Sequence, residues 1–240
     1  MPDEVPSVTR VNKAGDVIRQ YLGGGVWSLE DMDPFFQAFD VLEVWRAAHA
    51  APLQVATMGL RSRVATARCS AATRVSQRLK RIPTIMSKLH REPGMELGRM
   101  ADIGGCRAVV LDLDEVYRVL GRYQARNQPE VVKVRDYIKN PKDDGYRAVH
   151  VIVRYHGRLI EVQLRTQVQH EWAYTVESVT SRFGLDIKSG GGPPPVRAWF
   201  QAVSEAMAFE ERGQVVDTDL LQRVHTLREE AQPYLQGGRS

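Results

Sequence analysis

The chain has 240 residues, of which 43% are hydrophobic and 26% charged, and it carries a formal net charge of +4. This composition is typical of a globular protein with its own core and excludes a disordered chain. No stretch approaches the roughly 18 consecutive apolar residues of a membrane span, and the N-terminus lacks the apolar core of a signal peptide. Two cysteines, Cys69 and Cys106, provide neither a disulfide framework nor a metal cluster. We therefore expect a cytoplasmic protein, whose mildly basic charge slightly favours a phosphate-rich ligand.

Residues 1–70 predict an N-terminal helical region without a clear strand. Between residues 34 and 50, apolar side chains recur with a period close to 3.6. The glycines at 23–25 divide this region into two helical pieces. They do not form a phosphate loop, because no Lys-Ser/Thr pair follows them and no strand precedes them.

Residues 71–182 change to strands that alternate with helices. Val-, Ile- and Leu-rich segments predict strands at 105–111, 132–138, 148–155 and 158–165, and helices are expected at 83–92 and 114–126. This order predicts an α/β (α+β) core, in which helices flank a sheet.

The glycine and proline run at 190–195 then breaks the chain, and residues 196–236 predict a C-terminal helical extension. This extension either packs back on the core or binds a partner, including a second copy of the chain.

The segment 148–166 predicts a β-hairpin, because two alternating strands flank His156-Gly157. This turn places Val149, Val151 and Val153 opposite Leu164, Val162 and Ile160 on an apolar core face. The other face carries Ala148, His150, Ile152 and Arg154 from one strand, and Glu161, Gln163 and Arg165 from the other. Such a face is either an ordinary solvent-exposed sheet surface or part of a ligand-binding site.

Three neighbouring segments favour a site. A basic helix near 83–92 collects groups suited to phosphate: Arg78, Lys80, Thr84, Lys88 and Arg91. Asp102 precedes a Gly-Gly pair, and together with Glu161 and ATP it would make a typical Mg²⁺ site. The loop at 139–146 ends at Tyr146, which we expect to be exposed as a platform for a purine base.

Four ordered motifs over residues 73–179 resemble the synthetase domain of the RelA/SpoT homologue family. The matching positions are Arg78, Lys80, Thr84 and Lys88; Asp102, Gly105 and Arg107; Asp136, Tyr137, Pro141, Lys142, Gly145, Tyr146 and His150; and Glu161, Gln163, Arg165 and Thr166. The resemblance implies a nucleotidyltransferase-like synthetase fold with a mixed, mostly antiparallel sheet.

The resemblance also implies the role of each residue. Arg78 and Arg107 would sandwich the adenine of ATP, and its phosphates would be bound by Lys80, Thr84, Lys88 and Arg91. Asp102 would hold Mg²⁺, and Glu161 would be a second ligand or would activate the acceptor hydroxyl, beside Gln163. Tyr146 would stack on the acceptor's guanine, near Lys142, His150, Arg165 and Glu177.

The chain departs from the family pattern on the acceptor side, at Arg135, Asp144 and Ala148, and at Ser178 after Glu177. It carries no His-Asp hydrolase motif. Three functions stay open: a small alarmone synthetase that uses GDP or GTP, a toxic relative that pyrophosphorylates the 3′ end of tRNA and is neutralised by an antitoxin, and a nucleotide-binding regulator without activity.

Overall fold

A computed structural model describes residues 5–24, 29–184, 187 and 191–236. Gly25 and Gly190, which belong to the two glycine runs noted above, lie outside these residues. The helices are α1 (Val8–Leu22), α2 (Leu29–Ala47), α3 (Ala50–Thr66), α4 (Ile82–Arg91), the short 3-10 helix η1 (Leu97–Arg99), α5 (Leu113–Gln124), α6 (Gln167–Phe183), α7 (Pro194–Glu211) and α8 (Thr218–Gln236). The strands are β1 (Arg74–Leu79), β2 (Gly104–Val110), β3 (Glu130–Asp136), β4 (Val149–Tyr155) and β5 (Arg158–Thr166).

The five strands form one sheet in the order β1-β2-β5-β4-β3. Only the pairing of β2 with β5 is parallel, and the other three pairings are antiparallel. The predicted α+β fold with a mixed, mostly antiparallel sheet and flanking helices is therefore confirmed.

The β4–β5 hairpin has the register that the sequence predicts. Val149, Val151 and Val153 pair with Leu164, Val162 and Ile160. The turn residues His156 and Gly157 both have positive φ, at 47° and 74°. This is the geometry of a tight hairpin turn that matches the twist of the strands.

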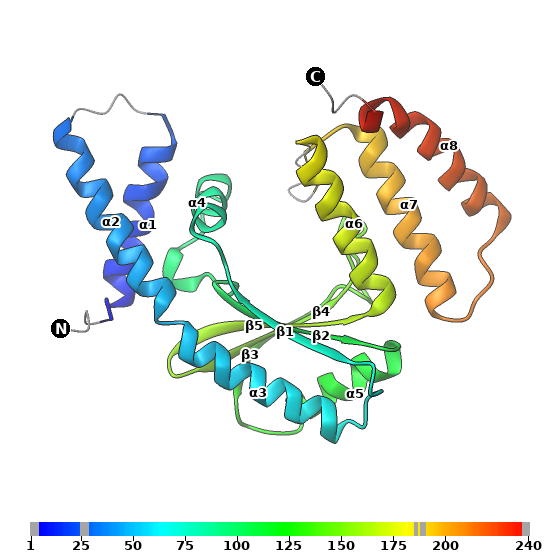
Figure 1. Ribbon diagram of the computed structural model, residues 1–240, viewed down its shortest axis with the longest axis horizontal. Helices are drawn as coiled ribbons and strands as arrows, with labels where there is room; N and C mark the ends of the chain where they lie inside the picture. Colours follow the sequence, from blue (N-terminus) through cyan, green and yellow to red (C-terminus); the bar gives the residue numbers. More distant parts are fainter. Residues whose placement is uncertain (1–4, 25–28, 185–186, 188–190, 237–240) are drawn as a thin grey trace.

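The apolar face of the sheet packs against α3 and α5, which lie on the same side of it in Figure 1. Leu53, Ala56 and Leu60 of α3 and Val116 and Val119 of α5 are fully or almost fully buried there. Because this face is filled, the polar side chains of the strands must lie on the opposite face.

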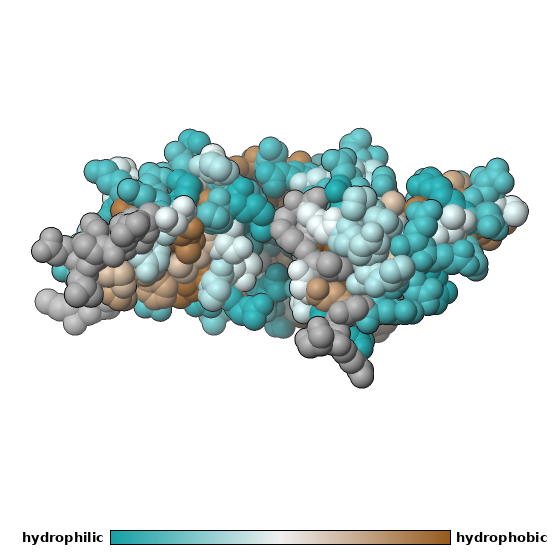
Figure 2. All heavy atoms as spheres, turned by 90° about the horizontal axis from the view of Figure 1, so that it is seen from above, coloured by the Kyte–Doolittle hydropathy of each residue, from teal (hydrophilic) through white to brown (hydrophobic). Residues whose placement is uncertain are grey.

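Two groups of helices rise on that opposite side (Figure 1). One group contains α1, α2 and α4, which share a second apolar cluster. The other contains α6, α7 and α8, which share a third. In the view from above (Figure 2), the surface between the two groups is largely hydrophilic. No helix among the described residues is long and apolar enough to cross a membrane.

Several boundaries differ from the sequence prediction. The helix expected at 34–50 begins earlier, at Leu29, and ends at Ala47, and a further helix follows from Ala50. The expected C-terminal helix is a pair, α7 and α8, and α7 packs back on α6 through Val196, Trp199 and Phe200. The sequence does not predict β1, because this strand lies at the edge of the sheet and has only two half-buried apolar residues, Val75 and Leu79, among exposed polar ones.

Candidate active site

Polar residues form rows across the open face of the sheet, because the strand registers align them. One row runs from Arg78 through Gly105 to Glu161. The next row contains Ser76, Arg107, Gln163, His150 and Arg135, one from each strand. The parallel β2–β5 pairing thus brings the predicted donor and acceptor motifs together.

Asp102 lies directly before β2 and binds two predicted phosphate ligands. Its Oδ2 atom is 2.7 Å from Lys80 Nζ and 3.1 Å from Lys88 Nζ. Burial would raise the pKa of the Asp102 carboxyl, but the two lysine charges outweigh it, so that the pKa is lowered despite the nearby charge of Glu161. Asp102 is therefore an anion that holds two cations where β1 and α4 approach β2.

Glu161 is almost fully buried and ionised. His150 Nδ1 lies 3.0 Å from its Oε1 atom, and Gln163 Nε2 donates to its Oε2 atom at 2.6 Å. Burial alone would raise the pKa of Glu161, but these hydrogen bonds, with the charges of His150 and Lys88, hold it at about 2. The influence of Lys88 on Glu161, and of Glu161 on Asp102, links the two carboxylates electrostatically.

Tyr146 continues this network. Its hydroxyl lies 2.7 Å from His150 Nε2, and Arg165 Nη2 donates to it at 2.5 Å. Arg165 Nη2 also donates to Gln163 Oε1 at 2.9 Å, which closes a ring of hydrogen bonds. Burial raises the pKa of Tyr146 to about 12, so the hydroxyl stays protonated at neutral pH.

The expectation that Tyr146 is an exposed aromatic is wrong. Its ring is half-buried, packs near Trp172 at a centroid distance of 6.5 Å and belongs to the third apolar cluster. Trp172 of α6 and the rings of Tyr137 and His150 lie around it. Lys142 lies over the rings of Tyr137 and Tyr146, with Nζ 4.9 and 5.0 Å from their centroids.

Arginines gather beside this ring of hydrogen bonds. Burial lowers the pKa of Arg107, and the neighbouring charges of Arg165 and Arg78 lower it further. Glu177 on α6 opposes them, as its charge raises the Arg107 pKa. The buried Nε atoms of Arg107 and Arg165 have no hydrogen-bond partner among the described residues. A cluster of arginines with unpaired N–H donors is suited to bind an anionic ligand.

Two predicted phosphate ligands lie at the ends of α4. Thr84 is exposed in the first turn, and Arg91 is exposed at the last residue, where it pairs with Glu92 at 3.7 Å. The structure therefore brings Lys80, Lys88 and Asp102 into direct contact, whereas Thr84 and Arg91 form no side-chain hydrogen bond or ion pair with them.

The sequence reasoning missed a group of buried polar residues that hold the site from behind. His170 is one, since its Nδ1 atom is buried without a partner near Arg107 and Arg165. Ser204 and Glu211 on α7 are two more, and they bind Arg147. Spacing offered a weak signal: His170 and Glu177 on α6, and Ser204 and Glu211 on α7, are both seven residues apart and share one helical face.

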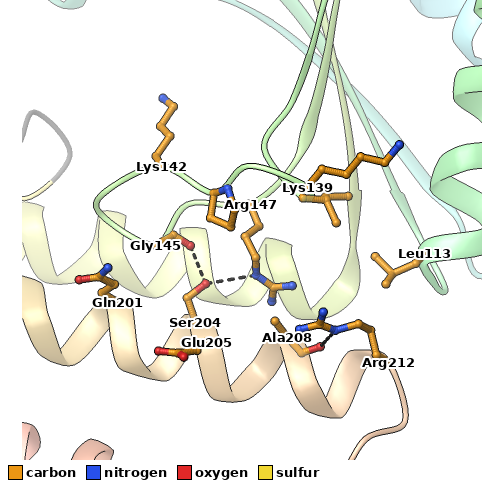
Figure 3. A pocket seen from close by; sticks show the side chains of 12 residues that line it. Leu113, Lys139, Lys142, Gly145, Arg147, Gln201, Ser204, Glu205, Ala208 and Arg212 are labelled. Carbon is orange, nitrogen blue, oxygen red and sulfur yellow. Dashed lines mark hydrogen bonds between the residues drawn. The ribbon is translucent and has the colours of Figure 1, made fainter. Parts of the chain in front are cut away.

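A pocket of about 450 Å³ lies between the 138–147 loop and α7, and Lys142 of the predicted acceptor side is one of its lining residues (Figure 3). Its lining comes from the loop, α7 and the start of α5, and includes Lys139, Pro141, Arg147, Ala208 and Arg212.

The donor set fits a magnesium ion that is held largely by its substrate. No group of three or more His, Cys, Asp or Glu side chains in the described part of the chain is arranged to hold a metal ion alone. Asp102 and Glu161 are both ionised and interact. One or two carboxylates plus substrate phosphates are the usual ligands of Mg²⁺.

Three of the departures from the family pattern can be located in the structure. Asp144 Oδ1 accepts from the Tyr146 backbone N–H at 2.9 Å, a turn that an Asn side chain makes equally well. Ala148 is fully buried. Arg135 is exposed on β3 and pairs with His150 in the sheet register.

Comparison with known proteins agrees with this architecture. Residues 77–181 match the family model described as the region found in RelA / SpoT proteins. The chain is 32% identical over 142 residues to the GTP pyrophosphokinase YjbM of Bacillus subtilis, and 35% identical over 118 residues to the bifunctional (p)ppGpp synthase/hydrolase SpoT of Escherichia coli. These matches cover 55% and 45% of this chain, and 65% and 17% of the relatives.

A solved structure extends the likeness beyond the matched region. The small alarmone synthetase 1 of Bacillus subtilis, bound to its product pppGpp, superposes with a TM-score of 0.58 at 25% identity, over 71% of this chain and 94% of that one. Residues 77–181 thus match the region found in RelA / SpoT proteins, and the fold around them is similar to that of a small alarmone synthetase.

Proposed function

We propose that the protein is an ATP pyrophosphokinase that transfers the β,γ-pyrophosphate of ATP to the 3′-hydroxyl of GDP or GTP and so makes ppGpp or pppGpp. The observation that carries this proposal is the electrostatically linked pair of Asp102, which is partly exposed, and Glu161, which is buried. Asp102 lies among the lysines of the donor side, and Glu161 lies in the hydrogen-bonded ring of the acceptor side.

On the donor side, Lys80 and Lys88 would bind the triphosphate. They now pair with Asp102, and their charges would offset the negative charge of ATP when it enters. A magnesium ion held by Asp102 and Glu161 would supply further neutralisation of the phosphates. Arg78 and Arg107 lie on adjacent strands, where they would hold the adenine between them.

On the acceptor side, Glu161 would take the proton. The 3′-oxygen attacks the β-phosphorus, the bond from that phosphorus to the α,β-bridging oxygen breaks, AMP leaves, and the hydroxyl proton passes to Glu161. Glu161 is ionised at neutral pH and can accept a charge-assisted hydrogen bond from the hydroxyl. Gln163 and His150 fix its orientation.

The names of the relatives support the guanine acceptor. YjbM is a GTP pyrophosphokinase, and the synthetase from Bacillus subtilis is bound to pppGpp as its product. Tyr146, with Lys142 over its ring, would border the guanine without lying open as a stacking platform. The Asp144 turn preserves the geometry of this loop despite the departure from the family pattern.

The acceptor is tested directly with ATP labelled at the γ-phosphate, Mg²⁺ and, in separate reactions, GDP, GTP and deacylated tRNA. We expect label in guanosine tetra- or pentaphosphate together with an equal amount of AMP. Label on tRNA alone would replace this proposal with the tRNA-modifying one and prompt a search for a neutralising antitoxin. If folded protein bound ATP but transferred to no acceptor, the catalytic proposal would fall in favour of a nucleotide-binding regulator.

A further inference from the structure

The α7 helix lies outside the residues that match the RelA/SpoT model, yet it enters the back of the site through one buried carboxylate. Glu211 has a side chain that is 3% exposed, and it accepts from Arg147 Nη1 at 2.5 Å. It also accepts from the Thr166 hydroxyl and from Gln169 Nε2. A buried charge with three donors is an anchor that water does not replace.

The partners of Glu211 directly follow two site residues in the chain. Arg147 follows Tyr146, and Thr166 follows Arg165. The Tyr146 hydroxyl and the Arg165 guanidinium are themselves hydrogen-bonded at 2.5 Å. Glu211 therefore fixes the two backbone segments whose side chains meet on the acceptor side.

Ser204, two turns earlier on α7, makes a second connection to the same loop. Its hydroxyl donates to the Gly145 carbonyl at 2.5 Å and accepts from Arg147 Nε at 3.2 Å (Figure 3). Both neighbours of Tyr146 in the chain are thus held by α7.

The pocket described above separates the first half of the loop from α7. Ile138, Lys139 and Pro141 line one side of it, and Ala208 and Arg212 line the other. Because about 450 Å³ of space lies between these residues, direct coupling of the helix to the loop is concentrated at Gly145 and Arg147.

We propose that α7 is a positioning element for the acceptor loop and that Glu211 is its main positioning residue. This inference deepens the proposed function and rests on it for its kinetic part. Glu211 sets the place of Tyr146 and Arg165 without touching the acceptor, whereas the lysines and Asp102 on the donor side are held independently by α4 and β1. Loss of Glu211 should weaken use of the acceptor and spare use of ATP.

The test compares Glu211→Gln, Ser204→Ala and the matched control Glu210→Gln, an exposed neighbour on the same helix. For Glu211→Gln we expect an acceptor KM raised about tenfold or more with an ATP KM within about twofold of the original protein. For Ser204→Ala we expect a rise of a few fold, in line with the loss of one hydrogen-bonding group. Glu210→Gln should leave both constants unchanged.

Two further measurements distinguish positioning of the acceptor loop from a general loss of stability. Val119→Ala, which leaves a cavity in the core beneath the sheet, should lower the melting temperature without shifting the acceptor KM selectively. Amide hydrogen exchange should become faster in residues 138–147 of Glu211→Gln and Ser204→Ala, and not in the two control variants.

The hydrogen-exchange measurement does not depend on transfer activity. It therefore tests the structural part of the inference even if the protein transfers to no acceptor, a result that would contradict the proposed function but not this inference. A folded Glu211→Gln variant with an unchanged acceptor KM and unchanged exchange in 138–147 would overturn the inference. If Glu211→Gln does not fold, the same readings on Ser204→Ala decide.

Discussion

Glu161 keeps its charge in a position where water is almost absent. Its residue is 9% exposed, and burial of a carboxylate without partners would favour the neutral acid. His150, Gln163 and the charge of Lys88 reverse that preference. The strand alternation therefore does more than point a carboxylate at the site, because the neighbours on the same face make it a stable anion.

Glu161→Gln is expected to lower the rate of transfer by at least about 100-fold, since the amide cannot accept the hydroxyl proton. ATP binding, measured by calorimetry, should change by no more than about threefold, because Lys80, Lys88 and Asp102 remain in place. Glu130→Gln, which alters an exposed glutamate on β3, serves as the control and should retain full activity. Normal turnover by Glu161→Gln would remove both the base role and the metal role from this residue.

At the scale of elements, the junction between α2 and α3 depends on His49. This side chain is 1% exposed, and its Nδ1 atom lies 2.8 Å from the Trp45 carbonyl oxygen. Burial lowers the pKa of His49 to about 4, from a model-peptide value of 6.5. Between about pH 4 and 6.5, the His49 imidazole is therefore neutral in the folded protein and protonated in the unfolded chain.

Stability should consequently fall as the pH is lowered from about 6.5 to about 4, because the unfolded state then binds more protons than the folded state. His49→Gln should reduce this dependence by at most about 1.4 kcal/mol per pH unit. Urea unfolding at several pH values measures it, with the exposed His225→Gln as the control. Equal pH slopes for the original protein and His49→Gln would contradict the assignment.

Gly145 shows how the acceptor loop and α7 constrain each other. Its φ is +87°, and a Cβ atom placed there would lie 3.0 Å from the Gln201 Cα atom of α7. Gly145→Ala should destabilise the protein by at least about 1–2 kcal/mol, from the backbone conformation alone. Gly121→Ala in α5, where a Cβ meets nothing within 4 Å, should instead stabilise it by about 0.5–1 kcal/mol. Thermal unfolding of both variants tests the contrast.

The sequence predicts those elements whose pattern is local. The register of the β4–β5 hairpin could be predicted residue by residue, because its turn and its alternation of apolar and polar residues indicate the same pairing. The break at His49 is signalled only by Pro52 in the first turn of α3, and it arises where α3 turns to cover the sheet. The exposed edge strand β1 lacks an apolar run, so only its pairing with β2 identifies it.

For the molecule as a whole, the arrangement of the site depends on pairings between distant segments. The parallel contact of β2 with β5 places Gly105 beside Glu161, 56 positions apart in the numbering, and no local pattern specifies it. The motif resemblance nevertheless brought Asp102 and Glu161 to one site. It gave no indication of Glu211, because that residue lies on a helix beyond the motifs and acts through Arg147 and Thr166.

The two groups of helices in Figure 1 correspond to two sides of the proposed reaction, which predicts separable kinetics. Lys88, on α4, binds Asp102, whereas Tyr146 binds His150 and Arg165 below α6 and α7. Lys88→Met should raise the KM for ATP about tenfold or more and leave the acceptor KM within about twofold. Tyr146→Leu should do the reverse, because it removes the hydroxyl that contacts both His150 and Arg165 on the acceptor side.

The double variant provides the sharper test, because changes at sites with separate contacts combine additively in free energy. Each KM of Lys88→Met/Tyr146→Leu should match that of the corresponding single variant, within about twofold. A rise in the acceptor KM on changing Lys88 alone would mean that the donor and acceptor sides form one coupled site. The positions of both helical groups around the sheet would then matter for each substrate, and the assignment of α4 to ATP and of the 138–147 loop to the acceptor would have to be abandoned.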